Sequence, residues 1–400
     1  MKIGLLTVGT EILLGDTVNT NLSKLGSILY NSGFYLNKEI TVSDERSEIE
    51  EGFKYLYESC EVIIICGGLG PTEDDITKES ISEILDIKLV LDKNHVAWME
   101  NRWKSRGLKM PETNIKQAMI PENAKKLINH NGTAPGLHMR DKDKNVIILP
   151  GPPNEFIPLV NEELIPFLQN EYDIKNKQYQ FVLFYNQAES QLAQEINKFK
   201  PDGIDIAYLA SKGVIKLRYD LKSISNKENL KFLQNLKDNF SEDILAFENI
   251  PLYTIIGNLL KEKNLTLSIV ESVTGGKITS KITQVPGISN HLISSDIVYT
   301  NFAKSKFLET EVNNSWEELV AELSIVSISK YNTDIAISIL GEAGPLSSTD
   351  YPIGKIFISI SSNKNTQITE HKLNGNRGEI IDRAANKAIW QLIKYIKTLY

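Results

Sequence analysis

The chain has 400 residues, a length that predicts two or three domains rather than one core. Its hydrophobic content of 41% is that of an ordinary globular protein, and its net charge of −7, with both signs mixed throughout, argues against a general nucleic-acid-binding surface. No apolar run approaches the roughly 18 residues of a membrane span, so we do not expect a membrane partner. Because of the charge pattern, we do not expect a nucleic acid as partner either. Cys60 and Cys66 lie at opposite ends of one apolar run, too far apart to bridge, and the five histidines are scattered. We therefore expect a cytoplasmic protein without a Cys/His metal cluster.

The first 170 residues alternate between strand and helix patterns. The runs KIGLLTV, FYLNKEITV and EVIIIC predict strands, and apolar residues at helical spacing between them, such as Leu22, Leu25 and Leu29, predict helices. The continuous β-branched run EVIIIC indicates a strand that is buried on both faces. Together these patterns predict a doubly wound α/β domain over residues 1–171, a fold that binds ligands beyond the carboxyl ends of its strands.

A glycine loop, GGLGPTEDD, follows directly after EVIIIC. Gly67, Gly68 and Gly70 leave backbone amides uncovered and permit positive φ, which suits close approach to an anionic group. Thr72 is predicted to cap a helix with Asp75 at the third helical position. The loop is therefore a candidate phosphate-binding site.

The acids behind this loop have two interpretations. Glu73, Asp74 and Asp75 could simply offset the dipole of a helix that starts here. Three consecutive acids would, however, repel a bare phosphate from the helix start that should attract it. A divalent cation between the carboxylates and the phosphate removes this conflict, so metal-assisted phosphate chemistry is favoured.

Further polar segments in this half are candidates for the same site. Thr10 and Glu11 come directly after the first predicted strand, and Asn114 and Gln117 lie in a turn-rich stretch as candidate base or ribose contacts. Two tight turns, GTAPG and LPGPPNEF, contribute the remaining candidate substrate contacts, which are Gly132, Thr133, Gly136, Pro152 and Glu155.

The segments GTEILLGDTVNTN, GGLGPTEDDITKE, NIKQAMIPENA, GTAPG and LPGPPNEF, in this order and spacing, resemble the N-terminal domain of the CinA family. That domain is similar in turn to the molybdopterin-binding fold. The resemblance covers almost all of residues 1–170 and implies a domain that hydrolyses the pyrophosphate of ADP-ribose with a divalent metal. It implies that Asp74 and Asp75 bind the metal, that Glu11 helps to position water, and that the loop glycines and Thr72 contact phosphate.

Residues 172–250 form a different kind of segment. Strand-like runs such as VIKLRYDL alternate with helical ones, which predicts a small α+β unit without a glycine loop or an acid cluster. Within the same resemblance this unit is similar to a KH-type linking domain. A KH domain holds nucleic acid with a GXXG loop, which this segment lacks, so a structural spacer is favoured.

Residues 251–400 predict another α/β unit. The strand LSIVES leads into the helix TGGKITSKITQV, so the turn that begins at Ser272 could offer free amides to an oxyanion or a phosphate. No His or Asp accompanies Ser272, so a Ser–His–Asp triad is not supported. An arrangement of Ser272 with Lys304 or Tyr299 remains open, as does the interpretation that Ser272 and Thr274 only cap a helix.

The segments ESVTGG, TQVPG, VYTNFAK, GEAGP and GNR resemble the C-terminal domain of the CinA family, whose members deamidate nicotinamide mononucleotide in pyridine-nucleotide salvage. The resemblance implies that Ser272 is the nucleophile and that Tyr299 and Lys304 belong to its pocket. Arg377 would suit the substrate phosphate because its planar guanidinium makes bidentate contacts. The further substrate contacts that it implies are Thr274, Gly275, Gly276, Asn301, Gly341 and Gly344.

The C-terminal segments depart from the family pattern at three places. Val273 replaces the usual Cys, a change that the site should tolerate. Leu340, where the family has Thr, removes a hydroxyl, and Leu346-Ser347-Ser348 replaces a glycine-rich tail, so these two departures put that activity in doubt. We therefore hypothesise that deamidation is reduced or lost. Three functions stay open: a hydrolase of nucleotide pyrophosphates in salvage, a molybdopterin-binding or transfer module, and a non-catalytic, competence-related nucleotide-binding protein. The resemblance also implies a homodimer.

Overall fold

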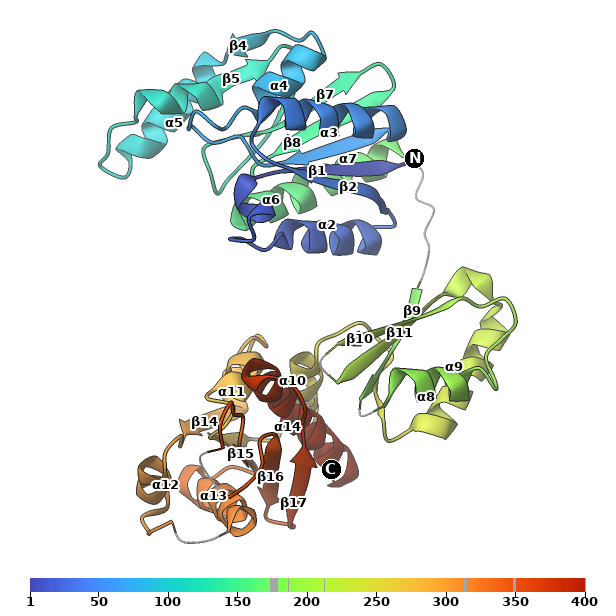
Figure 1. Ribbon diagram of the computed structural model, residues 1–400, viewed down its shortest axis with the longest axis vertical. Coiled ribbons are helices and arrows are strands. Elements are labelled where there is room, and N and C mark those ends of the chain that lie inside the picture. The colour runs from blue at the N-terminus through green and yellow to red at the C-terminus, as the bar shows by residue number, and fades with distance from the viewer. Residues whose placement is uncertain (173–178, 186, 212, 313–314, 348–349, 400) are drawn as a thin grey trace. The chain divides into compact units, whose positions relative to one another are not determined.

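The computed structural model describes residues 1–172, 179–185, 187–211, 213–312, 315–347 and 350–399. The chain divides into two compact units, Met1–Lys177 and Gln178–Tyr400 (Figure 1). Within the described residues, no helix is both long enough and apolar enough to cross a membrane.

The first unit is built on a six-stranded sheet in the order β2-β1-β3-β8-β7-β6. The first four strands are parallel, and β7 and β6 continue the sheet antiparallel. In sheet order, the strands are Leu36–Val42, Ile3–Val8, Val62–Cys66, Lys144–Leu149, Gly136–Asp141 and Lys125–Leu127. The predicted α/β domain is confirmed, with an antiparallel edge that the sequence patterns did not indicate.

Helices cover both faces of this sheet (Figure 1). Side chains such as Leu5 and Ile64 face α2, α6 and α7, whereas Leu6 and Ile65 face α3 and α4. Because successive side chains of β3 enter opposite cores, every residue of this strand is buried, as predicted for EVIIIC. The helices are α2 (Thr20–Asn31), α6 (Pro153–Leu159), α7 (Ile165–Glu171), α3 (Arg46–Ser59) and α4 (Thr77–Ile84).

A small excursion extends this unit beyond α4. Strands β4 (Leu89–Leu91) and β5 (Met119–Pro121) pair antiparallel, and the chain between them forms α5 (Lys93–Lys104) and the 3₁₀ helix η1 (Glu112–Ala118). A one-turn helix, α1 (Thr10–Leu13), follows β1. These short elements lie outside the main layers, and α1, α5 and η1 contribute residues to the cavities described below.

The predicted helix start at Thr72 is wrong. Helix α4 begins only at Thr77, and residues 72–75 form a turn in which Thr72 donates its amide to Asp75 Oδ2 at 3.0 Å and its hydroxyl to the same oxygen. Half of the pairing expected of a capping box is therefore present, but the Asp75 amide donates to the Thr72 carbonyl at 3.3 Å and the bonds close a turn. The Thr77 amide instead donates to the Gly68 carbonyl at 3.3 Å, which returns the chain to the glycine loop before the helix starts.

The second unit contains two sheets. A four-stranded antiparallel sheet, in the order β10-β11-β9-β12, is covered by α8 (Glu189–Ile196) and α9 (Asn226–Phe240). Its strands, in that order, are Ile206–Ser211, Val214–Asp220, Tyr179–Tyr185 and Ile244–Ala246. This arrangement agrees with the predicted α+β unit. The KH-type likeness and the boundaries at 171 and 250 stay predictions, and residues 173–178 lie outside the described part.

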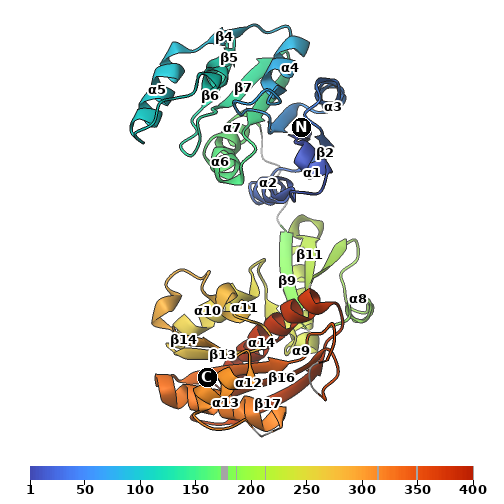
Figure 2. The same cartoon turned by 60° about the vertical axis from the view of Figure 1, so that its left-hand side comes forward.

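The other sheet of this unit has the order β14-β13-β15-β16-β17. The first three strands are parallel, and β16 and β17 are antiparallel. Helices α10, α11 and α14 cover one face, and α12 and α13 the other (Figure 2). The strands, in sheet order, are Leu292–Ile297, Leu267–Glu271, Ile335–Gly341, Lys355–Ser362 and Thr366–Lys372, and the helices are Leu252–Glu262, Lys277–Ile282, Arg377–Leu399, Asn301–Leu308 and Trp316–Tyr331.

Buried hydroxyl groups join α13 to this sheet. Ser327 Oγ donates to Ser268 Oγ on β13 at 2.7 Å. Ser324 Oγ lies 2.9 Å from Ser359 Oγ and 2.7 Å from Ser361 Oγ, both on β16. All five side chains are buried, so this interface combines apolar packing with paired hydroxyls.

Candidate functional sites

The glycine loop is fixed by steric requirements at two positions. Gly67 and Gly68 have φ values of +112° and +65°, a region that side chains other than glycine rarely adopt. A Cβ atom at Gly67 would overlap the Val8 carbonyl, and one at Gly68 would overlap Thr77 Oγ1. The loop therefore lies tightly between the end of β1 and the start of α4.

A cavity of about 620 Å³ opens at this loop, beyond the carboxyl ends of β1 and β3. It unites segments that are distant in the sequence, in the place where a doubly wound sheet binds its ligands. The predicted residues that line it are Glu11, Gly67, Gly68, Gly70, Asp74, Asp75, Gln117, Thr133, Pro152 and Glu155. Their roles in binding stay predictions, but the structure brings them to one cavity.

We call this the acidic cavity because five carboxylates line it and none of its lining residues is a Lys or Arg. The carboxylates belong to Glu11, Asp44, Asp74, Asp75 and Glu155. The pKa of Asp74 is lowered, chiefly by hydrogen bonding from Thr72, so this carboxylate stays ionised. An anionic ligand could enter the acidic cavity only together with a cation that offsets these charges.

Asp44 was missed by the sequence reasoning. It lies just beyond β2, so the rule that located Glu11 at the end of the first strand could have located Asp44 at the end of the second. Thr10, predicted as a substrate contact, instead donates its amide at 2.8 Å and its hydroxyl at 2.7 Å to Asp44 Oδ2. Thr10 therefore orients a carboxylate of the acidic cavity and does not line the cavity itself.

Four other predicted contacts also lie outside the lining of the acidic cavity. The first of these is Asn114, which donates to Gln117 Oε1 at 3.2 Å. The side-chain amide of Gln117, itself a lining residue, donates to the Leu69 carbonyl at 3.2 Å, so Asn114 supports the glycine loop through Gln117. Close packing explains the glycine at position 132, where a Cβ atom would overlap the carboxylate of Glu155. The other two are Gly136, where a Cβ atom would lie 3.0 Å from Leu127, and Thr72, which bonds Asp75.

The lining of the acidic cavity suits a hard divalent cation only in part. Across the described residues, no three His, Cys, Asp or Glu side chains are grouped so that they could hold a metal ion by themselves. Carboxylate oxygens are nevertheless the ligands that Mg²⁺ prefers, and Mg²⁺ is often held by one or two carboxylates plus the phosphates of a substrate. The donor set therefore fits a cation whose coordination is completed by a phosphate ester and water.

A second cavity, of about 420 Å³, lies at the carboxyl ends of β13 and β15. Arg377, the first residue of α14, donates to Tyr299 Oη at 2.7 Å and to the Gly344 carbonyl. Lys304 Nζ lies 3.4 Å from the Tyr299 carbonyl, and burial lowers the pKa of this lysine. The predicted residues that line this cavity are Ser272, Tyr299, Asn301, Lys304, Gly341 and Arg377.

The amides at the start of α11 are occupied from within the chain, whereas the amides of Val273 and Thr274 have no acceptor within the described residues. Glu271 is completely buried, and its carboxylate accepts hydrogen bonds from the amides of Gly276 and Ile278, both at 3.1 Å, and of Thr279 at 2.8 Å. The Gly275 amide donates to the Ser272 carbonyl at 3.1 Å. The start of α11 is therefore already occupied by an internal carboxylate and does not offer these amides to a substrate.

The predicted contacts Thr274, Gly275, Gly276 and Gly344 do not line the second cavity. Thr274 is buried, and its hydroxyl has no hydrogen-bond partner within the described part of the chain. Two lining residues, Glu342 and Trp316, were missed by the sequence reasoning. Glu342 belongs to the segment GEAGP, so that segment contributes a buried carboxyl side chain as well as Gly341.

Leu340 forms part of the wall of the second cavity. Its side chain is buried and packs in one cluster with Val270 and Phe357. Leu346, by contrast, is 84% exposed at the rim, and Ser347 Oγ donates to the Tyr351 carbonyl at 2.7 Å. Ser348 lies outside the described residues.

Comparisons with known proteins agree with this architecture. The model of the probable molybdopterin binding domain matches residues 4–170, and that of the CinA C-terminal domain matches residues 249–396. A putative competence-damage inducible protein of Clostridium beijerinckii is 34% identical over 397 residues, covering 95% of this chain and 96% of the relative. A CinA-like protein of Kosmotoga olearia is 34% identical, with 97% of each chain covered. The solved structure of the protein CinA, of unknown function, from Thermoplasma acidophilum is 35% identical and covers 41% of this chain and 99% of its own, with a TM-score of 0.38. From its full-length relatives and its two matched domains, the chain belongs to the CinA family.

Proposed function

We propose that the N-terminal unit hydrolyses the pyrophosphate bond of a nucleotide of the ADP-ribose class with the help of a divalent cation. The observation that carries this proposal is the acidic cavity, whose lining has five carboxylates around a glycine loop and neither Lys nor Arg. A pyrophosphate carries several negative charges, so a cation has to offset its repulsion from these carboxylates. That requirement favours metal-assisted chemistry over simple anion binding.

The residues of the acidic cavity divide naturally into roles. Asp74 and Asp75 would hold the cation, which when bound neutralises phosphate charge and favours attack by water. The Gly67 amide donates to the Leu149 carbonyl at 3.0 Å, which leaves Gly68 and Gly70 as the phosphate contacts of the loop. The Glu11 carboxylate accepts no hydrogen bond from a described residue, so it is available to orient the attacking water.

The test is an assay of ADP-ribose hydrolysis by the purified full chain with Mg²⁺ or Mn²⁺. The quantity measured is the release of AMP and ribose 5-phosphate. Asp74→Asn should lower kcat by about 100-fold or more, because it removes a charge that the transition state requires. Asp74 is exposed, so the melting temperature should not change. The matched control is Glu73→Gln, since Glu73 is a neighbouring acid outside the cavity lining. Absence of turnover with several divalent metals, or equal losses in both variants, would contradict the proposal.

A pterin-binding role is the second candidate, because the N-terminal match is to a probable molybdopterin binding domain. A pterin that stays bound through purification can be detected by its fluorescence after oxidation. Retention of a pterin, together with no hydrolysis of ADP-ribose, would favour this role. Absence of both would favour a nucleotide-binding protein without catalysis.

For the C-terminal unit we propose a deamidase-like site for nicotinamide mononucleotide, in a pyridine-nucleotide salvage role, with reduced activity. The support for a site is the common cavity of Ser272, Lys304 and Arg377, in which burial lowers the pKa of Lys304 from its ordinary value. The support for reduced activity is the apolar wall at Leu340 and the absence of free amides at the start of α11. Water would convert the amide to a carboxylate with release of ammonia.

Leu340→Thr tests this proposal as a gain of function. Restoring a hydroxyl in the cavity wall should raise ammonia release from nicotinamide mononucleotide by about tenfold, the size of one hydrogen bond gained in the transition state. Ser272→Ala in the same background should abolish the gain. High activity of the unmodified chain that disappears with Ser272→Ala would show instead that the site is intact.

A further inference from the structure

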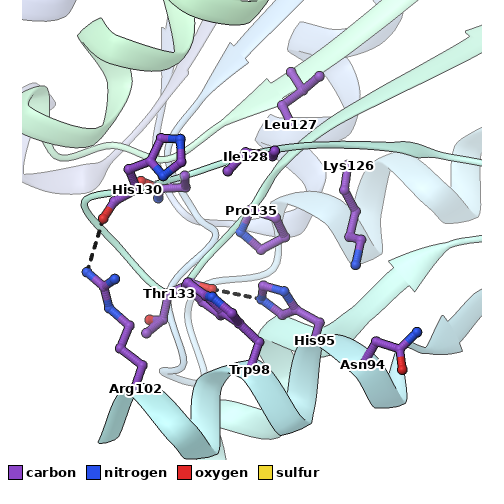
Figure 3. A pocket seen from close by; sticks show the side chains of 11 residues that line it. Asn94, His95, Trp98, Arg102, Lys126, Leu127, Ile128, His130, Thr133 and Pro135 are labelled. Carbon is purple, nitrogen blue, oxygen red and sulfur yellow. Dashed lines mark hydrogen bonds between the residues drawn. The ribbon is translucent and has the colours of Figure 1, made fainter. Parts of the chain in front are cut away.

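A third cavity, of about 440 Å³, lies in the N-terminal unit (Figure 3). Helix α5 forms one side of it, and the segment from β6 to β7 forms the other. Thr133 lines both cavities, so a ligand in one is adjacent to the other. The volume falls within the range of about 300–1,000 Å³ that small-molecule sites occupy. We call it the α5 cavity.

The charges of the α5 cavity are opposite to those of the acidic cavity. Its lining includes Arg102 and Lys126 but no Asp or Glu. Arg102 donates to the His130 carbonyl at 3.3 Å, and its guanidinium lies 5.5 Å from the centre of the Trp98 ring (Figure 3). A cationic wall beside apolar side chains suits a flat aromatic group that belongs to an anionic molecule.

Trp98 provides an aromatic side chain that ring contacts with His95 and Arg102 hold in place and that is still partly exposed. Its side chain is 40% exposed, although an indole of this size is usually buried in a core. The ring stacks on His95 with centres 5.2 Å apart, and His95 Nε2 is hydrogen-bonded to the Thr133 carbonyl at 2.9 Å (Figure 3). These contacts fix the orientation of the indole before any ligand binds, which lowers the entropy lost on binding.

Two apolar residues complete the cavity. Ile128 and Pro135 come from the segment that faces α5, and Ile128 is 62% exposed (Figure 3). An aliphatic side chain and a proline ring on one side, with an indole on the other, form surfaces on which a planar ring can pack. The acidic cavity contains no aromatic side chain among its lining residues, so a base has no comparable surface there.

We propose that the α5 cavity binds the heteroaromatic base of the nucleotide whose pyrophosphate occupies the acidic cavity, with Trp98 as the stacking surface. This inference rests on the proposed pyrophosphatase function. Thr133 marks the junction, with the base on the α5 side and the phosphates on the side of the glycine loop. Arg102 attracts the anionic nucleotide to the α5 cavity, whereas Lys126 is ion-paired with Asp92, and the acidic cavity selects for the metal-bound pyrophosphate. The chain therefore distinguishes a nucleotide from a sugar phosphate that lacks a base.

The test measures binding rather than turnover, by calorimetric titration of the full chain with AMP or ribose 5-phosphate in the presence of Mg²⁺. Trp98→Ala should weaken AMP binding about tenfold, equivalent to about 1.4 kcal/mol, and leave ribose 5-phosphate unaffected, because only AMP carries a base. Trp98→Phe should retain most of the affinity for AMP, since it keeps an aromatic face. Tyr55→Ala, which removes another exposed aromatic side chain of the same unit, is the matched control and should change neither Kd.

The outcomes separate this inference from the proposed function. AMP binding that is absent, or that is insensitive to Trp98→Ala, overturns the base site even if ADP-ribose is hydrolysed. An equal loss for both ligands also overturns it, because the role of Trp98 would then be structural. A loss confined to AMP supports the base site even if no divalent metal produces turnover, in which case it is the hydrolysis that fails.

Discussion

The buried carboxylate of Glu271 is the feature whose removal has the most predictable effect on stability. It accepts hydrogen bonds from three amides of the α11 start and from the hydroxyl of Thr279, the last at 2.7 Å. Glu271→Ala leaves those three amides without an acceptor. A buried donor without a partner costs about 1–3 kcal/mol. Since water can reach the two amides that are only partly buried, we expect a total loss of about 3–5 kcal/mol in the free energy of unfolding of the C-terminal unit.

That loss is a large share of the roughly 5–15 kcal/mol that typically stabilises a domain. For a unit of this size it corresponds to a fall in melting temperature of about 6–20 °C. Differential scanning calorimetry of the full chain measures this, because it can resolve the transitions of the two units. The matched control is Glu262→Ala at the end of α10, where the side chain is 68% exposed and its loss should change the free energy by less than about 0.5 kcal/mol. A loss below about 1 kcal/mol for Glu271→Ala would refute the assignment of this carboxylate as the cap of α11.

Two further predictions concern other parts of the chain. Gly68→Ala should destabilise the N-terminal unit by about 2–4 kcal/mol in urea unfolding, because it combines a left-handed backbone with a clash against buried Thr77. Gly26→Ala in α2, where a Cβ atom meets nothing within 4 Å, should be neutral or slightly stabilising, and similar losses in both variants would contradict this account. Burial lowers the pKa of Lys387 from 10.5 to about 8, and the charge of Lys394 adds to this effect while that of Asp243 opposes it. The unfolded chain therefore binds more protons between pH 8 and 10.5, so stability should rise with pH across that window. Lys387→Met should show a smaller rise, and identical pH profiles of the two proteins would count against the shift.

The layered architecture could be predicted because the strands are buried on both faces. The continuous apolar run Val62–Cys66 is only five residues long and is followed by glycines. A helix is usually longer, so a buried strand is the favoured interpretation of such a run. The position of the acidic cavity followed from the same pattern, since the ends of parallel strands meet at one edge of the sheet. The antiparallel edge formed by β7 and β6 was not predicted, because the sequence pattern does not specify the direction in which neighbouring strands pair.

The errors arose where a side chain competes for backbone groups. Thr72 and Asp75 form one of the two hydrogen bonds of a capping box without a helix, because the pattern specifies local bonds but not the path of the chain after them. Glu271 was included in an apolar strand, and nothing in that strand indicates that its last residue turns inward to cap the next helix. The α5 cavity was missed because the exposure of Trp98 depends on the tertiary structure. Trp98 lies in the segment between β4 and β5, and the sequence pattern does not show how that segment is placed against the rest of the unit.

The paired hydroxyls between α13 and the sheet limit how this helix can move and which substitutions it can accept. Apolar packing is non-directional, so a helix held by it alone could slide along the sheet by a turn with little loss. Such a slide would separate Ser327 from Ser268 and Ser324 from its partners on β16, which would leave the buried hydroxyls of Ser327 and Ser359 without the partners they have here. Substitutions at these serines are therefore coupled, and replacement of both partners of a pair by alanine should be tolerated better than replacement of one. Because the same helix packs in the cluster that contains Leu340, these hydroxyls also determine where one wall of the second cavity lies.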